Sequence, residues 1–396
     1  MIAQWLELPA AEAVVALARE LVRIPTANPP GNEEPCVRLA DAWLRGCGFT
    51  TTVVPYGAGR AHVVGRRRGS GERPGLLFSG HVDVVPPGEV AWQRDPFSGV
   101  VEEGRLWGRG ACDMKGGVAA LLVAAREVAR AGRPLRGDLA VAITADEERG
   151  CLGAMQLAQE PLFAGLRYAL VAEPSALDLF LAEKGGVWLE VTMIGRTAHG
   201  SMPECGANAI AAMADLLVTL EREIRPGRSL VGDVPPHPLL TPPTLSVGTI
   251  HGGVKTNVVA DRCVATLDFR VVPGLAIDEL IRRVDAIAQA VAARRPGIRY
   301  ELATHARCEP VASPQEGALA QALIAAHRTV TGAEPRIGGV PYVTEACVWV
   351  PVLGMEMAIC GPGDPALAHQ PDEFVPVSEL QQAVDIYRSA AETLLT

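Results

Sequence analysis

The chain has 396 residues, of which 48% are hydrophobic and 20% are charged, a composition typical of an ordinary globular protein. This length can bury a large core and favours two domains over one. The balance of 36 basic against 45 acidic residues gives a net charge of −9, which argues against a nucleic acid or a membrane as the partner. Either of these would require a basic face.

The cysteines and the apolar runs indicate the compartment. The nine cysteines are an odd number without C-x-x-C spacing, so they predict reduced thiols in the cytoplasm and not a disulfide framework. The first residues lack the basic start of a signal peptide, and no apolar run is long enough to span a bilayer. We therefore expect a cytoplasmic protein.

The amino-terminal part of the chain predicts two helices followed by two strands. An apolar stripe favours a helix over residues 11–23, and a second helix covers about residues 33–45. Residues 51–54 and 61–64 are typical of strands. In the second strand we expect His62 to point outward, because it alternates with apolar neighbours.

A histidine and a carboxylate follow the next apolar run, Leu76-Leu-Phe78, which predicts a buried strand of a parallel sheet. His81 and Asp83 are two residues apart, so in extended backbone both can face the cavity beyond the strand's carboxyl end. One interpretation makes His81 a metal ligand whose other ring N–H is held by Asp83. The other is a turn histidine capped by a nearby Asp, which is the more common case for an isolated His-x-Asp.

Asp113 lies in the glycine-rich segment Gly110-Ala-Cys-Asp-Met-Lys-Gly-Gly117, just before a predicted helix over residues 118–131. The glycines let the backbone turn tightly and approach a bound group. The segment is not a phosphate loop, because it lacks the G-x-x-x-x-G-K-[ST] order and a strand directly before it. Asp113 is either the N-cap of the helix or a carboxylate that offers one oxygen to each of two cations.

An acidic turn, Asp146-Glu147-Glu148, follows a predicted strand over residues 138–144, and Glu173 follows another over residues 168–171. Adjacent carboxylates repel one another unless cations neutralise them, although a solvated turn is the alternative. In a doubly wound sheet, positions after strands or before helices of successive βα units share one edge. The two acidic segments, together with the histidine and aspartate motifs above, therefore favour a metal site at that edge.

The chain changes character after residue 182. Residues 183–305 predict the β-α-β-β-α-β order of a ferredoxin-like domain, inserted into a domain formed by residues 1–182 and 306–396. The predicted fold class is therefore α/β, with a mostly parallel, doubly wound sheet and an inserted α+β domain. His369 lies in a Gly/Pro-rich loop of the resumed part and supplies a second imidazole.

Six motifs occur in order along nearly the whole chain. They are Gly80-His-Val-Asp83, Gly110-Ala-Cys-Asp-Met-Lys-Gly-Gly117, Ala145-Asp-Glu-Glu148, Ala172-Glu-Pro-Ser175, Thr197-Ala-His-Gly-Ser201 and His369-Gln-Pro-Asp-Glu373. Together they resemble the co-catalytic dizinc amidohydrolases and peptidases of the M20 group, which includes acetylornithine deacetylase and succinyl-diaminopimelate desuccinylase. Any one motif would be a weak signal, whereas six in register are a strong one.

The resemblance implies a centre of two divalent ions, with zinc expected and cobalt or manganese also suited to mixed His/carboxylate ligands. Asp113 would bridge the two ions. The resemblance also implies that His81 and Glu173 are the other ligands of one ion, and that Glu148 and His369 are those of the other. It also implies a cis peptide bond after Asp113.

The residues alone leave open which of Glu147 and Glu148 is the general base and which is a metal ligand. The family pattern decides this. It makes Glu147 the general base, with Asp83 as the catalytic support of the first histidine ligand. Glu147 would take a proton from a water between the two ions and pass it to the leaving amine.

In the inserted domain, the resemblance implies roles for three residues and a function as lid and dimerisation domain. His199 would reach the active site of the partner subunit and stabilise the oxyanion, although it is otherwise a surface-loop histidine. Asn257 and Arg270 match positions that hold the substrate, and arginine suits a carboxylate because it offers two parallel hydrogen bonds. The alternative for Arg270 is a surface ion pair with Asp268.

The segment Tyr342-Val-Thr-Glu-Ala346 and the loop around His369 look closest to acetylornithine deacetylase. We therefore expect hydrolysis of the amide of a small N-acyl amino acid. Glu345 would lie near a substrate ammonium or, equally, be a helix-start carboxylate without a role in specificity.

Two other functions stay open. One is a carboxypeptidase, dipeptidase or succinyl-diaminopimelate desuccinylase on the same scaffold, because fold and metal site do not fix the substrate. The other is a non-catalytic protein that only binds in the cleft. The expected partners are a small N-acyl amino acid or dipeptide and, in a homodimer, a second copy of the chain.

Overall fold

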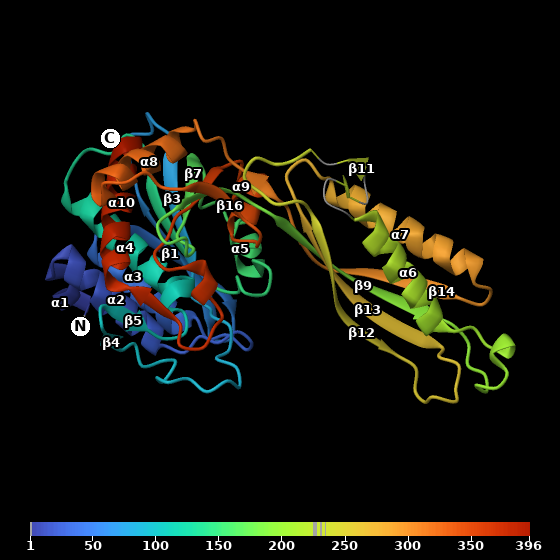
Figure 1. Cartoon of the computed structure of the whole chain (residues 1–396). Coiled ribbons are helices and arrows are strands. Elements are labelled where there is room, and N and C mark those ends of the chain that lie inside the picture. Colours follow the sequence, from blue (N-terminus) through green and yellow to red (C-terminus); the bar gives the residue numbers. More distant parts are fainter. Residues whose placement is uncertain (1, 225–227, 230–231, 234) are drawn as a thin grey trace. The chain divides into compact units, whose positions relative to one another are not determined.

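The computed structural model describes residues 2–224, 228–229, 232–233 and 235–396, and the chain separates into two compact units (Figure 1). Unit 1 comprises Met1–Ala182, Ala312–Gly339 and Thr344–Thr396, and unit 2 comprises Glu183–Val311 and Val340–Val343. The first segment of unit 2 therefore ends at residue 311, beyond the expected 305, because its last strand, β14 (Arg299–Cys308), continues past that point.

In the described part of unit 1, nine strands form one mixed sheet with the order β1-β2-β6-β3-β7-β17-β8-β15, and β16 pairs with β8. The strands are β1 (Thr50–Gly57), β2 (Arg60–Arg67), β3 (Gly75–His81), β6 (Leu139–Thr144), β7 (Leu166–Val171), β8 (Leu179–Glu183), β15 (Val311–Ala312), β16 (Ile337–Val340) and β17 (Glu356–Ile359). The neighbours β6, β3, β7 and β17 run parallel, whereas β1, β2 and β8 pair antiparallel. Every residue of β3 and β6 is buried, as their continuous apolar runs predict.

The register of the central strands aligns their carboxyl ends. His81 at the end of β3 lies opposite Thr144 at the end of β6, and Ser79 lies opposite Val171 at the end of β7. The segments that follow these three strands therefore leave the sheet at one edge, which is where open α/β sheets bind ligands.

The helices of unit 1 cover the sheet and one another. They are α1 (Ile2–Glu7), α2 (Ala10–Arg23), α3 (Glu34–Gly46), α4 (Gly116–Arg130), α5 (Leu152–Leu157), α8 (Ala318–Thr331), α9 (Ala346–Leu353) and α10 (Val377–Leu395). Helix α4 contacts β3, β6, α2, α3 and α10, which explains why most of its side chains are buried. A small separate sheet joins β18 (Phe374–Pro376) to β5 (Arg105–Trp107) and β4 (Val101–Glu102).

His62 on β2 points inward, so the expectation of an outward side chain is wrong. It is fully buried, and its Nδ1 accepts the backbone N–H of Ala145 at 3.1 Å. Strand β2 is an inner strand between β1 and β6 and packs against α3, and its residues 61–65 are all buried, so neither face is open to solvent there. The alternation rule applies only where one face of a strand meets water.

Unit 2 follows the chain order β9 (Gly185–Ile194), α6 (Ala209–Glu223), β12 (Thr244–Gly252), β13 (Arg262–Val271), α7 (Ile277–Arg294) and β14. Its four long strands, all within the described residues, pair antiparallel in the order β12-β13-β9-β14. Strand β13 alternates between buried and half-exposed positions, because one face of the sheet packs under α6 and α7.

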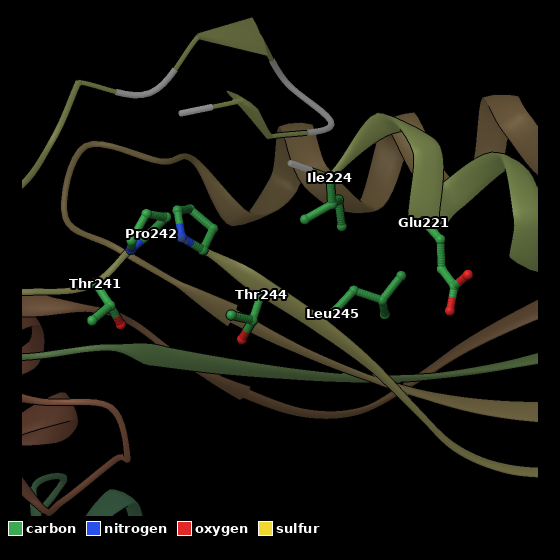
Figure 2. Close-up of a pocket in the computed structure, with 7 residues that line it drawn as sticks. Glu221, Ile224, Thr241, Pro242, Thr244 and Leu245 are labelled. Atoms are coloured by element: carbon green, nitrogen blue, oxygen red, sulfur yellow. The ribbon is translucent and has the colours of Figure 1, made fainter. Parts of the chain in front are cut away.

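A hollow of about 340 Å³ lies in unit 2, at the end of α6 and the start of β12 (Figure 2). It is lined by Glu221, Ile224 and residues 241–245 and contains none of the expected metal ligands. The described helices include no candidate for a membrane span.

Candidate metal centre

His81 is oriented by Asp83, two residues later, in the turn after β3. Its Nδ1 donates to the backbone carbonyl of Asp83 at 2.9 Å, and the Asp83 carboxylate is farther away, at 3.5 Å. With its proton on Nδ1, the ring presents an unprotonated Nε2 to the site. Asp83 thus supports His81 mainly through its carbonyl, whereas the sequence had suggested the carboxylate.

The carboxylate of Asp83 holds the acidic turn instead. It accepts the backbone N–H groups of Glu147 and Glu148 at 3.1 and 3.2 Å. The side chain of Asn28 donates to it at 2.9 Å, and Asp83 is fully buried. One carboxylate therefore fixes the backbone of both glutamates that were expected to act in the site.

Asp113 lies in the turn Ala111–Lys115, directly before α4, and its own backbone is extended, with φ of −117° and ψ of 100°. The N-cap position of α4 is occupied by Lys115, so the N-cap interpretation of Asp113 is wrong. The peptide bond between Asp113 and Met114 is cis, as the family resemblance implied.

A buried pair that the sequence analysis did not assign clamps this turn. Glu373 accepts the backbone N–H groups of Cys112 and Asp113 at 2.9 and 3.1 Å. Its other oxygen accepts from Arg109 at 2.5 Å, and both side chains of this ion pair are buried. Because β18 pairs with β5, the clamp also brings the loop of His369 to the turn that carries Asp113.

The three acids after β6 do not point the same way. Asp146 has a left-handed backbone, with φ of 65°, and its carboxylate turns away to Tyr56, Asn28 and Arg60. In contrast, Glu148 Oε2 lies 3.2 Å from His369 Nε2, and Glu147 Oε2 lies 4.0 Å from His81 Nε2. A solvated acidic turn is excluded, since Asp146 is only 2% exposed.

Asp113 offers a different oxygen to each of two histidines. Its Oδ1 lies 3.2 Å from His81 Nε2, which is also 3.4 Å from Glu173 Oε1. Its Oδ2 lies 3.2 Å from His369 Nε2, which is the partner of Glu148. The structure thus brings together two groups of candidate ligand atoms that share the carboxylate of Asp113.

These distances fit bound ions. Two ligand atoms at about 2.0–2.1 Å from a tetrahedral zinc ion lie about 3.3 Å apart. His81 Nε2 and Glu148 Oε1 are buried atoms for which the described residues provide no hydrogen-bond partner, as expected of atoms reserved for a cation. Glu147 also lies within 4.8 Å of the ligand atoms of His81 and Glu173, but its 4.0 Å distance to His81 Nε2 favours Asp113 as the third ligand.

The electrostatics of the cluster also indicate a cation. Burial and neighbouring negative charges raise the pKa of Glu147 and Glu148, and they raise that of Glu173 to about 8. Hydrogen bonds to Asp113 and Glu148 raise the pKa of His369 to about 10. Divalent ions would relieve this crowding, because their charge lets the same carboxylates ionise.

Glu345 is fully buried beneath this edge of the sheet. It accepts hydrogen bonds from the hydroxyls of Thr144 at 2.5 Å and Ser79 at 2.6 Å. It occupies the N-cap position of α9 without a side-chain cap hydrogen bond, and burial raises its pKa. What the structure shows is a carboxylate that links β3 and β6, and a contact with a substrate ammonium stays a prediction.

In unit 2, His199 and Asn257 lie in two neighbouring exposed loops. The backbone N–H of Gly200 donates to the carbonyl of Asn257 at 2.8 Å, and the backbone N–H of Ser201 donates to His199 Nδ1 at 3.2 Å. In the neutral ring the proton is therefore on Nε2, which is a hydrogen-bond donor.

Arg270, on β13, grips Asp268 through two nitrogens at 2.9 and 3.0 Å, which is the ion pair considered as the alternative. The functional roles of Arg270, His199 and Asn257 stay predictions.

The residues that sequence reasoning missed all support the expected ligands. Glu373 is the last residue of one family motif, and Arg109 directly precedes another. Their nearness to these motifs in the sequence was the signal that could have identified them. Asn28, Tyr56 and Arg60 had none, because they reach the site only after the first helices and strands have packed.

Comparisons with known proteins agree with this geometry. The model of the family described as Peptidase family M20/M25/M40 matches residues 77–393. The chain is 31% identical to a succinyl-diaminopimelate desuccinylase of Gluconacetobacter diazotrophicus, over 98% of each chain. It is 32% identical to an acetylornithine deacetylase of Vibrio atlanticus, over 90% of each chain.

Among solved structures, an M20 family metallo-carboxypeptidase from Sulfolobus solfataricus has the same fold. The TM-score is 0.81 at 20% sequence identity, and the match covers 96% of this chain and 98% of that one. The matched family model spans most of the sequence and includes every expected metal ligand. The chain therefore belongs to peptidase family M20/M25/M40 and is a hydrolase.

Proposed function

We propose that this protein hydrolyses the amide bond of a small N-acyl amino acid at a centre of two divalent metal ions, with Zn²⁺ as the expected metal and Co²⁺ or Mn²⁺ as alternatives. The observation that carries the proposal is the position of Asp113, whose two oxygens each lie 3.2 Å from a different histidine nitrogen. The ligands of one ion would be His81, Asp113 and Glu173, and those of the other Asp113, Glu148 and His369.

The chemistry that two such ions supply when bound is Lewis acidity, which lowers the pKa of water and polarises a scissile carbonyl. Glu147 would move the proton. It lies at the edge of the ligand cluster, and the thiol of Cys151 donates to its Oε1 at 3.4 Å, which holds the carboxylate in place. A buried carboxylate with a raised pKa can accept a proton from the attacking water and deliver it to the leaving amine.

His199, Asn257 and Arg270 would complete the site in a homodimer formed through the inserted unit 2, which would act as the lid and dimerisation domain. The donor on His199 Nε2 suits a developing oxyanion, and its exposure in a single chain suits a contact made in the dimer. Arg270 would exchange its bidentate contact with Asp268 for a substrate carboxylate. A cytoplasmic location is proposed from the cysteine pattern alone.

The substrate class rests on the relatives, a deacetylase and a desuccinylase, which both remove an acyl group. A carboxypeptidase or dipeptidase is the second candidate, which the name of the solved metallo-carboxypeptidase favours. The experiment is a panel of N-acetyl amino acids, N-succinyl amino acids and dipeptides, assayed with added Zn²⁺ or Co²⁺.

We expect hydrolysis of N-acyl amino acids to be fastest in this panel. Faster cleavage of dipeptides would favour the peptidase, and a metal content near zero without hydrolysis would indicate the non-catalytic binding protein. The Glu147→Gln variant is the control in every assay, because activity that survives in it comes from another enzyme or another base.

A further inference from the structure

We infer that Asp146 is a positioning residue, which together with Asn28 fixes the direction of the two glutamates that follow it. This inference rests on the proposed function of Glu147 and Glu148. The carboxylate of Asp146 is not one of the candidate ligand atoms, and it accepts hydrogen bonds from Asn28, Tyr56 and Arg60.

Both oxygens of the Asp146 carboxylate accept hydrogen bonds from residues far away in the sequence. Oδ1 accepts from Asn28 Nδ2 at 2.7 Å and from Arg60 at 2.9 Å, and Oδ2 accepts from the hydroxyl of Tyr56. The residue is almost completely buried and has the left-handed φ of 65°. That backbone conformation is uncommon outside glycine, so it persists where side-chain contacts hold it.

Asn28 connects this anchor to the backbone of the glutamates. One N–H of its amide donates to Asp146, and the amide also donates to the Asp83 carboxylate at 2.9 Å. Asp83 in turn accepts the backbone N–H groups of Glu147 and Glu148. The turn is therefore fixed through the side chain of Asp146 and through the backbone N–H groups of Glu147 and Glu148.

The far end of the network is fixed within the protein core. Arg60 pairs with Glu33 at 2.6 Å as well as with Asp146, and Glu33 is fully buried. The guanidinium of Arg60 also lies over the ring of Tyr56, 5.1 Å from its centroid. Tyr56 and Arg60 belong to β1 and β2, and Glu33 directly precedes α3, so the anchor couples the turn to the packing of these elements.

The expected consequence is a specific loss of site geometry. Without the Asp146 carboxylate, the left-handed turn loses its side-chain anchor, and Glu147 and Glu148 lose their fixed directions. Residues that orient metal ligands typically change metal affinity or activity about 10–100-fold when they are replaced.

The test compares Asp146→Ala and Asp146→Asn with Asp138→Asn as a matched control. Asp138 also pairs with an arginine of β2, Arg66 at 2.6 Å, but it precedes β6, at the other end of the strand from Asp146. For each protein we would titrate the metal-free form with Co²⁺ by calorimetry, measure kcat and KM, and measure stability in urea.

For Asp146→Ala we expect Co²⁺ affinity to fall about 10–100-fold at one of the two sites, and kcat to fall by a similar factor with little change in KM. Asp146→Asn keeps the shape and one acceptor, so it should recover part of both losses. Asp138→Asn should lose stability while its Co²⁺ affinity and kcat stay those of the wild type.

Three results would overturn the inference. Asp146→Ala could bind Co²⁺ as tightly as the wild type, or Asp138→Asn could lose the same affinity as Asp146→Ala, which would reduce the effect to general stability. A wild-type protein that binds no Co²⁺ would remove the proposed function and this inference together. If the wild type binds two Co²⁺ ions, the first of these results would remove the inference and leave the proposed function in place.

Discussion

The expected site residues of unit 1 and unit 2 differ in how firmly the chain holds them. In unit 1, His81 is 1% exposed and lies between the carboxylates of Asp113 and Glu173, whereas the side chain of His369 is 51% exposed but lies 3.2 Å from both Asp113 and Glu148. In unit 2, His199 is exposed, and Arg270 is paired with Asp268. The metal centre can therefore be argued from the packing of one unit, whereas the roles in unit 2 depend on a dimer and a substrate.

The largest effect is expected at Glu147, and it tests whether unit 1 holds the catalytic base. Glu147→Gln keeps the size of the side chain but removes the proton acceptor, so turnover should fall by about 10²–10⁴-fold while both metals stay bound. Steady-state kinetics and elemental analysis of the purified variant measure the two quantities. Glu160→Gln, at an exposed acid, is the control, and a near-normal rate in Glu147→Gln would remove the base assignment.

His199 comes next, because it decides whether unit 2 takes part in the chemistry. We expect His199→Ala to lower kcat about 10²–10³-fold, the typical cost of removing an oxyanion donor, with unchanged stability because the side chain is exposed. His305→Ala, at another exposed histidine of unit 2, is the control.

Mixing the variants tests whether His199 acts across the dimer. A hybrid of one His199→Ala chain and one Glu147→Gln chain contains one site with both residues intact, so roughly a quarter of the wild-type activity should return after random exchange. If hybrids form and no activity returns, the action of His199 in the partner subunit is wrong.

The buried network of unit 1 should make stability depend on pH through His62. Burial lowers its pKa from 6.5 to about 4, with Asp83 and Asp146 opposing that shift and Arg60 assisting it. Because the folded protein favours the neutral ring, this stabilisation is complete above pH 6.5 and is lost as the pH falls towards 4. The loss is about 3 kcal/mol.

Urea unfolding at pH 7 and pH 4.5, for the wild type and His62→Gln, measures this contribution. The wild type should lose more stability than the variant, and the difference isolates His62 from the carboxylates that titrate in the same range. Equal losses in both proteins would show that the ring contributes nothing to the pH dependence.

The smallest effect is expected at Arg270, where the structure shows an ion pair and the family pattern predicts substrate binding. Arg270→Lys keeps the charge but loses the two-pronged contact, so KM should rise roughly tenfold with little change in kcat. Arg307→Lys, at an exposed arginine of unit 2, is the control. An unchanged KM in Arg270→Lys would leave Arg270 as a partner of Asp268 only.

Sequence reasoning succeeded where a local pattern has one structural solution. Apolar runs without polar interruptions predicted β3 and β6, and the residues after them were expected at one sheet edge, where the register places them. It failed at His62, because alternation does not reveal whether a second layer covers the strand. It also left Asp146 without a role, since an acid beside two others gives no sign of the distant residues with which its carboxylate pairs.

The sequence by itself determined which side-chain types follow which strands, and through the family motifs it determined the chemistry to expect. Only the tertiary structure decided the direction of each side chain. Glu373 orders the backbone of Asp113 from 260 residues away, and Arg60 holds Asp146 from 86 residues away. Local preferences extend over a few residues, whereas the orientation of a buried charge is set by whichever distant partners satisfy its hydrogen bonds when the core forms.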